Sequence, residues 1–282
     1  MSQDQSGRGP GTQAGPTALT LTVTERARGL LRRDPSGDVL NATLRLLAKW
    51  RAQVLANTLR ARNGTTVRAG PFRGMAYTVA AAEGAWAARM LGVYESSLAP
   101  VFETVIARGY PQILDVGCAE GYYAVGLARR MPGARVLAHD TDPKARALVA
   151  ELAAANGGAD RVTVGGEIGH ADFALCQKER TFLLCDIEGA EEGLLDPAAA
   201  PGLLSADILV EGHEGMKPGL TERLVARFAP SHRVTVIGRR IDGTSLPDWA
   251  EGLSDLDRLL LLWEWRGGPT PWLWLERKDD AA

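Results

Sequence analysis

The stretch Ile113–Gly121 joins an apolar run to a short glycine-bounded turn, a pattern typical of a cofactor-binding loop. Glycine lets the backbone pass close to a ligand where a Cβ atom would clash, and the helix expected to follow offers free N–H groups to a carboxylate. Asp115, near the end of the apolar run, has the charge to face an ammonium group. The turn residues predicted to contact a cofactor are Gly117, Cys118, Ala119, Gly121 and Tyr122.

Acidic residues end the next two apolar runs. Asp140 follows the second run, where a carboxylate can accept both hydroxyls of a ribose, and Asp142 is a further candidate close behind. Glu167 ends the third run and is predicted to border an adenine ring. Dehydrogenases use a similar strand, turn and acid, but the turn here is Gly-x-x-x-Gly, and no Tyr-x-x-x-Lys pair of the short-chain dehydrogenases occurs in the sequence.

A second group of polar residues follows the fourth and fifth apolar runs. Asp186 and Glu188 come after the fourth, and Glu211 and His213 after the fifth, so all four are expected at the carboxyl edge of a sheet. Asp186 is predicted to contact the cofactor. Glu188, Glu211 and His213 are the candidate catalytic residues, with His213 as a general base.

Two alternatives to a catalytic base stay open for this second group. His213 could only satisfy neighbouring backbone groups after a buried strand. The oxygen-rich cluster could instead hold Mg²⁺, which takes carboxylate ligands, although a site without metal is the favoured expectation.

The elements that must position these residues alternate between short apolar runs and helical stretches, which is typical of repeated βα units. We therefore expect a Rossmann-like α/β domain with a seven-stranded, mostly parallel sheet. The expected strands are Ile113–Gly117, Arg135–Asp140, Val162–Glu167, Thr181–Asp186, Ala206–Glu211, Arg233–Gly238 and Pro271–Glu276. His232, at the start of the sixth strand, is expected to be solvated.

The region before the sheet is predicted to be a helical and hairpin cap over residues 19–109, after a disordered tail over residues 1–18 and before a cofactor-binding domain over residues 110–282. An amphipathic helix is expected from about Asp38 to Arg62. It could pack on its own domain or serve as a homodimer contact. A hairpin or extended loop over 65–79 and helices over 81–91 and 96–108 complete the cap.

Composition excludes several classes of partner. The net charge of -2 and pI near 6.1 give no basic field for nucleic acid or anionic membranes. The three cysteines indicate neither a disulfide framework nor a zinc site, and the chain start lacks the apolar segment of a signal peptide. A cytoplasmic protein that acts on a small molecule is therefore expected.

Two motifs resemble those of a known family. The strings D-V-G-C-A-E-G-Y-Y and H-D-T-D-P are similar to the first two motifs of class I methyltransferases that use S-adenosylmethionine (SAM). Cys185–Glu191 looks like the D-x-E-G-x-E segment of FkbM-type methyltransferases, and Glu211–Glu214 resembles their E-x-H element. The resemblance covers roughly residues 112–215 and implies SAM as the cofactor.

The resemblance further implies methyl transfer, to a hydroxyl oxygen of a small metabolite or sugar-containing molecule. N- or C-methylation of a small molecule or peptide is the alternative within this chemistry. A nicotinamide-dependent oxidoreductase is the alternative outside it.

Overall fold

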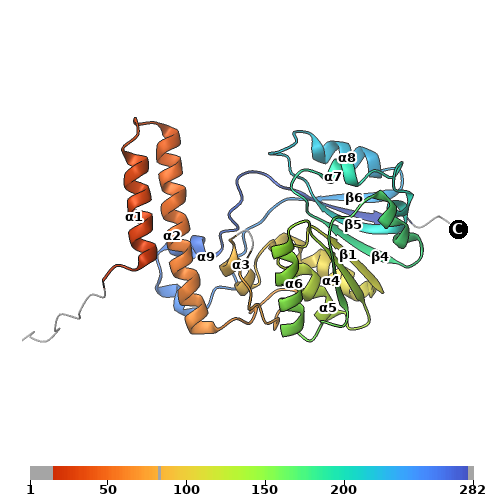
Figure 1. Cartoon of the computed structure of the whole chain (residues 1–282), viewed down its shortest axis with the longest axis horizontal. Helices are drawn as coiled ribbons and strands as arrows, with labels where there is room; N and C mark the ends of the chain where they lie inside the picture. Colours follow the sequence, from red (N-terminus) through yellow and green to blue (C-terminus); the bar gives the residue numbers. More distant parts are fainter. Residues whose placement is uncertain (1–14, 82–83, 279–282) are drawn as a thin grey trace, which may run out of the picture. The chain divides into compact units, whose positions relative to one another are not determined.

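The structure is a computed structural model, and it describes residues 15–81 and 84–278. The chain divides into two compact units, one that ends at Val54 and one that begins at Leu55 (Figure 1). Most of the tail predicted over residues 1–18 lies outside the described residues. The predicted domain boundaries stay a prediction.

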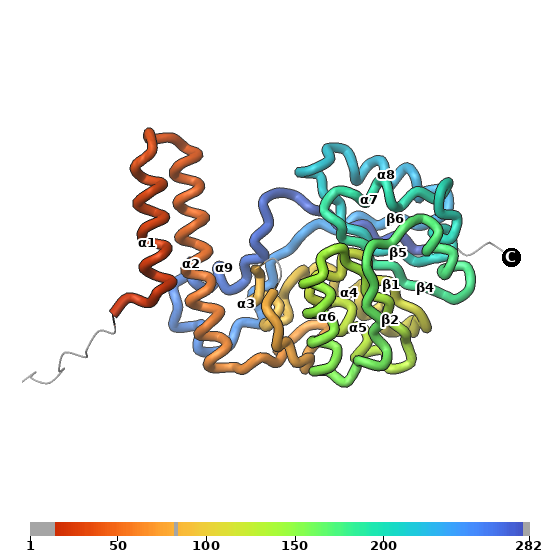
Figure 2. Tube along the Cα trace, in the orientation of Figure 1, coloured from red at the N-terminus to blue at the C-terminus, as the bar shows by residue number. Residues whose placement is uncertain are grey.

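The first unit is a pair of helices. Helix α1 (Ala18–Leu31) begins at the N-cap Thr17, whose hydroxyl accepts a hydrogen bond from the amide of Thr20 at 3.2 Å. Helix α2 (Gly37–Asn63) matches the predicted amphipathic helix and continues into the second unit. Figure 2 shows α1 lying beside the first half of α2. Helix α1 was not predicted from the sequence.

The second unit is built on a seven-stranded sheet in the order β3-β2-β1-β4-β5-β7-β6. β7 is antiparallel to both of its neighbours, and the other pairs are parallel. This confirms the predicted seven-stranded, mostly parallel Rossmann-like sheet. The strands are β1 (Gln112–Val116), β2 (Arg135–His139), β3 (Val162–Gly165), β4 (Thr181–Cys185), β5 (Ala206–Glu211), β6 (His232–Ile237) and β7 (Trp272–Arg277).

Helices cover both faces of this sheet (Figure 1). One face carries α4 (Ala99–Arg108), α5 (Tyr122–Arg130) and α6 (Pro143–Ala155), and the other carries α7 (Glu191–Leu194) and α8 (Leu220–Phe228). Leu114 and Val116 of β1 join the buried core that includes Leu224 of α8. Because side chains alternate along a strand, Asp115 points to the opposite face, toward α5.

The strand order reverses at β1, which lies between β2 and β4. In α/β sheets the carboxyl ends on either side of such a reversal leave a crevice where ligands bind. The loops after β1, β2 and β4 all emerge there, so the fold brings the predicted site residues to one edge.

Shorter elements complete the second unit. A single antiparallel bridge joins Thr66 and Ala76 in the predicted hairpin region. Helix α3 (Trp86–Leu91) begins later than the helix predicted over 81–91, because Gly84 has φ of 104°, which is not helical; residues 82–83 of that prediction lie outside the described residues. The remaining elements are 3₁₀ turns at Ser96–Leu98, His170–Gln177, Pro201–Ser205 and Asp248–Gly252, and helix α9 (Asp255–Leu261).

The prediction that His232 is solvated is wrong. Its ring is buried, with Nε2 3.0 Å from the carbonyl oxygen of Ala206 and Nδ1 2.8 Å from the hydroxyl of Ser231.

Among the described helices, none has both the length and the apolar character needed to cross a bilayer. The cytoplasmic location expected from the sequence stays a prediction.

Candidate functional site

A cavity of about 680 Å³ opens at the carboxyl edge of the sheet, among the loops after β1, β2, β3 and β4. It brings together most residues predicted from the sequence. Those on its wall are Gly117, Cys118, Ala119, Tyr122, Asp140, Glu167, Asp186 and Glu188. Those outside its lining are Asp115, Gly121, Asp142, Glu211 and His213.

The glycines of the β1 turn are required by the chain's own packing. Gly117 has φ of 82°, and a Cβ atom there would lie 1.7 Å from the carbonyl oxygen of Asp186. Gly121 has φ of 91°, and its Cβ would lie 3.2 Å from the side chain of Val149 in α6. The close approach that we attributed to a ligand is, at Gly117, an approach of two backbone segments.

Asp140 links the β1 turn to the β2 loop. Its Oδ2 accepts a hydrogen bond from the amide of Ala119 at 2.9 Å, and its Oδ1 accepts one from the amide of Asp142 at 2.8 Å. A carboxylate has about four acceptor positions, so it retains capacity for ribose hydroxyls. Asp142 has a different task, because its side chain caps α6 by accepting from the amide of Lys144 at 2.9 Å.

Asp115 is a buried carboxylate, only 1% exposed, and neither oxygen has a well-formed hydrogen bond to a described residue, although the backbone amide of Ala124 lies close enough to lower its pKa. Burial raises its pKa to about 8, and the negative charge of Asp186 adds to the shift. Burying a carboxylate without a partner is costly, so a cation brought against it would be strongly favoured. This fits the ammonium group that the sequence assigned to Asp115.

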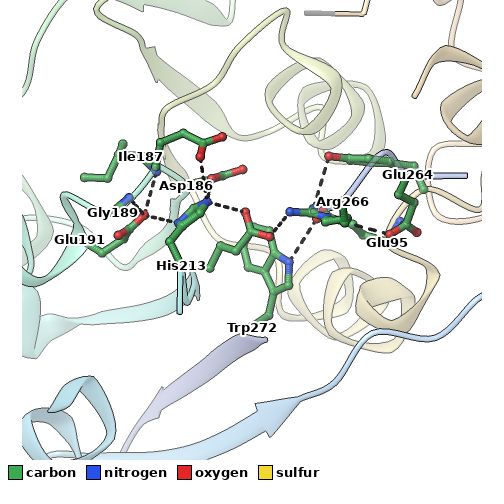
Figure 3. A network of polar contacts seen from close by, with 12 residues as sticks. Glu95, Asp186, Ile187, Gly189, Glu191, His213, Glu264, Arg266 and Trp272 are labelled. Atoms are coloured by element: carbon green, nitrogen blue, oxygen red, sulfur yellow. Dashed lines mark hydrogen bonds and ion pairs between the residues drawn. The ribbon is translucent and has the colours of Figure 1, made fainter. Parts of the chain in front are cut away.

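The second group of predicted residues surrounds one imidazole (Figure 3). Nδ1 of His213 lies 2.7 Å from Oε1 of Glu191. Nε2 lies 3.5 Å from Asp186, 3.4 Å from Glu188 and 3.3 Å from Glu211, measured to a carboxylate oxygen in each case. The predicted convergence of these side chains is therefore seen in the structure.

The charges of this cluster shift its pKa values in opposite directions. Burial lowers the pKa of His213, but hydrogen bonding to Glu191 and the charge of Asp186 raise it by more, so the net shift is upward. Burial raises the pKa of Glu191, but His213 and the amide of Gly189 lower it by more. The pair therefore favours a protonated imidazole beside an ionised carboxylate.

An arginine that the sequence reading missed extends the cluster on its far side (Figure 3). Arg266 forms ion pairs with Glu211 and with Glu95. Glu95 also accepts a hydrogen bond from the indole of Trp272 at 3.2 Å. Arg266 lies in a loop with no periodic pattern or motif, so the sequence carries no local signal for its role.

Three residues of the cluster could also bind a metal ion. Asp186, Glu211 and His213 each offer one ligand atom, and these atoms lie within 4.8 Å of one another. Two carboxylates and an imidazole suit a divalent cation. The arrangement can therefore serve either proton transfer or metal binding.

The strand order with its antiparallel β7, together with the cavity at the reversal of that order, defines a Rossmann-like α/β fold with a ligand-binding crevice. No family model matches the chain. It is 31% identical over 140 residues to the release factor glutamine methyltransferase of Cereibacter sphaeroides, a match that covers 47% of this chain and 46% of that protein. The chain thus spans about half the length of this curated relative.

Solved structures give only distant similarities. The O-methyltransferase from Bacillus cereus in complex with SAH is 15% identical, with a TM-score of 0.44 over 91% of this chain and 97% of that one. The O-methyltransferase TomG from Streptomyces achromogenes in complex with SAM is 14% identical, with a TM-score of 0.42 over 80% and 89% of the two chains. The fold is therefore assigned from the strand order of this chain.

Proposed function

We propose that this chain catalyses SAM-dependent methyl transfer. The observation that carries the proposal is the buried, unpartnered carboxylate of Asp115 beneath the β1 turn, at the edge of the sheet where Asp140 and Asp186 also emerge. A cofactor with an ammonium group and a ribose satisfies Asp115 and Asp140 together. A nicotinamide dinucleotide has no ammonium group to offer Asp115.

Each part of the cofactor has a matching residue. Asp140 would accept the ribose hydroxyls, because its carboxylate is already oriented by the amides of Ala119 and Asp142. Glu167, on the wall after β3, would border the adenine, and Asp115 would accept from the ammonium. Bound SAM supplies an electrophilic methyl group, and the chain supplies position and exclusion of water.

The acceptor that we propose is a hydroxyl oxygen of a small metabolite or sugar-containing molecule. The FkbM-like segment and the polar cluster after β4 and β5 support this choice. Asp186 and Glu188 lie on the cavity wall, whereas His213 lies directly behind them. The acceptor proton would pass to this cluster, with the neutral form of His213 as its final acceptor.

A second candidate role for the cluster is metal binding, which the mutual distances of Asp186, Glu211 and His213 favour. A hard cation at this position would lower the pKa of an acceptor hydroxyl. Chelation separates the two roles, since it abolishes a metal-dependent reaction and leaves a base-dependent one intact.

The experiment that tests the proposal offers the protein SAM with a deuterated methyl group and a pool of candidate metabolites and peptides. We expect S-adenosylhomocysteine to form and one acceptor to gain the labelled methyl group on oxygen. Label on nitrogen or carbon would support methyltransferase activity but contradict the proposal that the acceptor is a hydroxyl. Binding of NADH instead of SAM would overturn the proposal as a whole.

We also propose that the first unit mediates homodimer formation. Leu40, Leu44 and Leu47 on α2 are spaced to share one helix face, and all three are exposed. Two helices alone bury little apolar surface, and Val23 is the only buried hydrophobic residue of α1. A second copy of the pair would complete a four-helix bundle around these leucines.

A further inference from the structure

Arg89 is a buried cation on the wall of the cavity, outside every motif that the sequence singled out. It lies on α3 and is 4% exposed. Its Nε is 3.1 Å from Oε1 of Glu120, which is also buried. Its guanidinium carbon lies 4.0 Å from the ring centroid of Tyr94, a cation–π contact.

These contacts leave part of the guanidinium without a partner. Nη1 of Arg89 is buried and donates no hydrogen bond to any described residue. The same oxygen of Glu120 is already engaged, because Oε1 also accepts a hydrogen bond from the hydroxyl of Tyr77 at 2.5 Å. Arginine never loses its proton at ordinary pH, so Arg89 requires an additional acceptor when it is shielded from water.

The unpartnered donor of Arg89 has a counterpart in the unpartnered carboxylate of Asp115. Glu120, which forms an ion pair with Arg89, lies in the turn that follows Asp115 at the end of β1, and Arg89 and Glu120 line the same cavity. Nη1 of Arg89 lacks an acceptor, and the carboxylate oxygens of Asp115 lack a donor. A group with a carboxylate and an ammonium on one carbon would satisfy both at once.

We propose that Arg89 binds the carboxylate of the cofactor's amino-acid end while Asp115 binds its ammonium. This inference rests on the proposed function, because it takes SAM as the cofactor. It adds a charged side chain to the sequence expectation that the amides at the start of α5 receive the carboxylate. Arg89 is thus a selectivity residue, one that admits the zwitterionic cofactor and disfavours a cofactor that lacks the carboxylate.

The test compares two ligands by calorimetry: SAM and decarboxylated SAM, which retains the ammonium, ribose and adenine. The wild type should bind SAM about 10- to 100-fold more tightly, the range for a hydrogen bond between charged groups. Arg89→Gln should bind SAM more weakly than the wild type does and bind decarboxylated SAM equally well, so that the preference is lost. Arg89→Lys should keep part of it because the charge remains.

Arg89→Gln leaves Glu120 buried without its cation and could fail to fold. The double variant Arg89→Gln/Glu120→Gln removes both charges, and its ligand preference decides the question in that case. Arg108→Gln is the matched control, because Arg108 also forms ion pairs but lies away from this cavity. It should bind both ligands as the wild type does.

The outcomes separate the two proposals. If the wild type binds neither ligand, the proposed function fails. If the wild type binds both ligands equally, or if a folded Arg89→Gln protein keeps the full preference for SAM, the cofactor assignment stands and the role of Arg89 is overturned.

Discussion

Nδ1 of His213 lies 2.7 Å from Oε1 of Glu191, a carboxylate with no exposed surface. The contact joins the start of α7, which follows β4, to the loop after β5. Glu191 also accepts hydrogen bonds from the amides of Ile187 at 3.2 Å and Gly189 at 3.1 Å. One buried acid thus holds both loops that carry the candidate catalytic residues.

This contact should make stability depend on pH. The pKa of His213 is raised above 6.5, so its stabilisation is complete below pH 6.5 and is lost as pH rises through the folded-state value. The pKa of Glu191 is lowered below 4.5, so its contribution is present above pH 4.5 and is lost in more acidic solution. Urea unfolding followed by tryptophan fluorescence should show stability falling above pH 6.5.

The matched variants for this experiment are His213→Gln and His170→Gln. In His213→Gln, the free energy of unfolding should fall less steeply above pH 6.5 than in the wild type. In His170→Gln it should fall as in the wild type, because His170 contacts the carbonyl of Gly193 rather than the acidic cluster. An equally steep fall in His213→Gln would place the titrating group elsewhere.

Turnover should depend on His213. If its neutral form takes the acceptor proton, His213→Ala should lower turnover by about a hundredfold or more with little change in SAM affinity. The wild-type rate should rise with pH through the elevated pKa of His213. Turnover measured with and without a chelator separates this role from a metal site, and a fully active, chelator-insensitive His213→Ala would exclude both.

Gly117 should tolerate no side chain. Its φ of 82° and the 1.7 Å approach of a Cβ to the Asp186 carbonyl mean that Gly117→Ala must separate the β1 turn from the end of β4. We expect a loss of more than about 1 kcal/mol in the free energy of unfolding, together with weaker SAM binding. Gly133→Ala is the control, since nothing lies within 4 Å of its Cβ. Equal stability of the two variants would contradict this packing.

The homodimer should depend on the exposed leucines of α2. Leu44 is 66% exposed, and Leu44→Glu would place a charge on the proposed contact. Light scattering after size exclusion should show a dimer for the wild type. The dissociation constant of the dimer should be about tenfold or more higher in the variant. Leu204→Glu changes an exposed leucine of the second unit and should have no effect. A monomeric wild type would overturn the proposal.

The sheet could be predicted from the sequence because β1, β4 and most of β5 are buried on both faces, and β2 and β3 alternate or end in apolar residues beside them. The apolar runs end where the chain leaves the core, so Ala206–Glu211 was predicted without error and the other strands within two residues at either end. Helix α1 was not predicted, because Ala18–Leu31 contains β-branched residues and is exposed over most of its length. These two features leave only a weak helical pattern in the sequence.

Part of the site could be predicted for the same reason, and part could not. Asp140 and Asp186 follow strands directly and His213 follows β5 after one residue, so strand prediction also places them at one edge. Arg89 and Arg266 reach the site from outside the βα units. Their acidic partners are 31 and 55 residues away along the chain, and no local pattern encodes such pairing.

Calorimetric titration with SAM of the wild type, Asp140→Ala and Asp142→Ala tests the central claim most directly. We expect the wild type to bind SAM and Asp140→Ala to bind it about 10- to 100-fold more weakly, because the ribose loses its carboxylate. Asp142→Ala should lose only the cap of α6 and keep its affinity. A wild type that binds no SAM, or an Asp140→Ala protein with unchanged affinity, would contradict this assignment of the cavity.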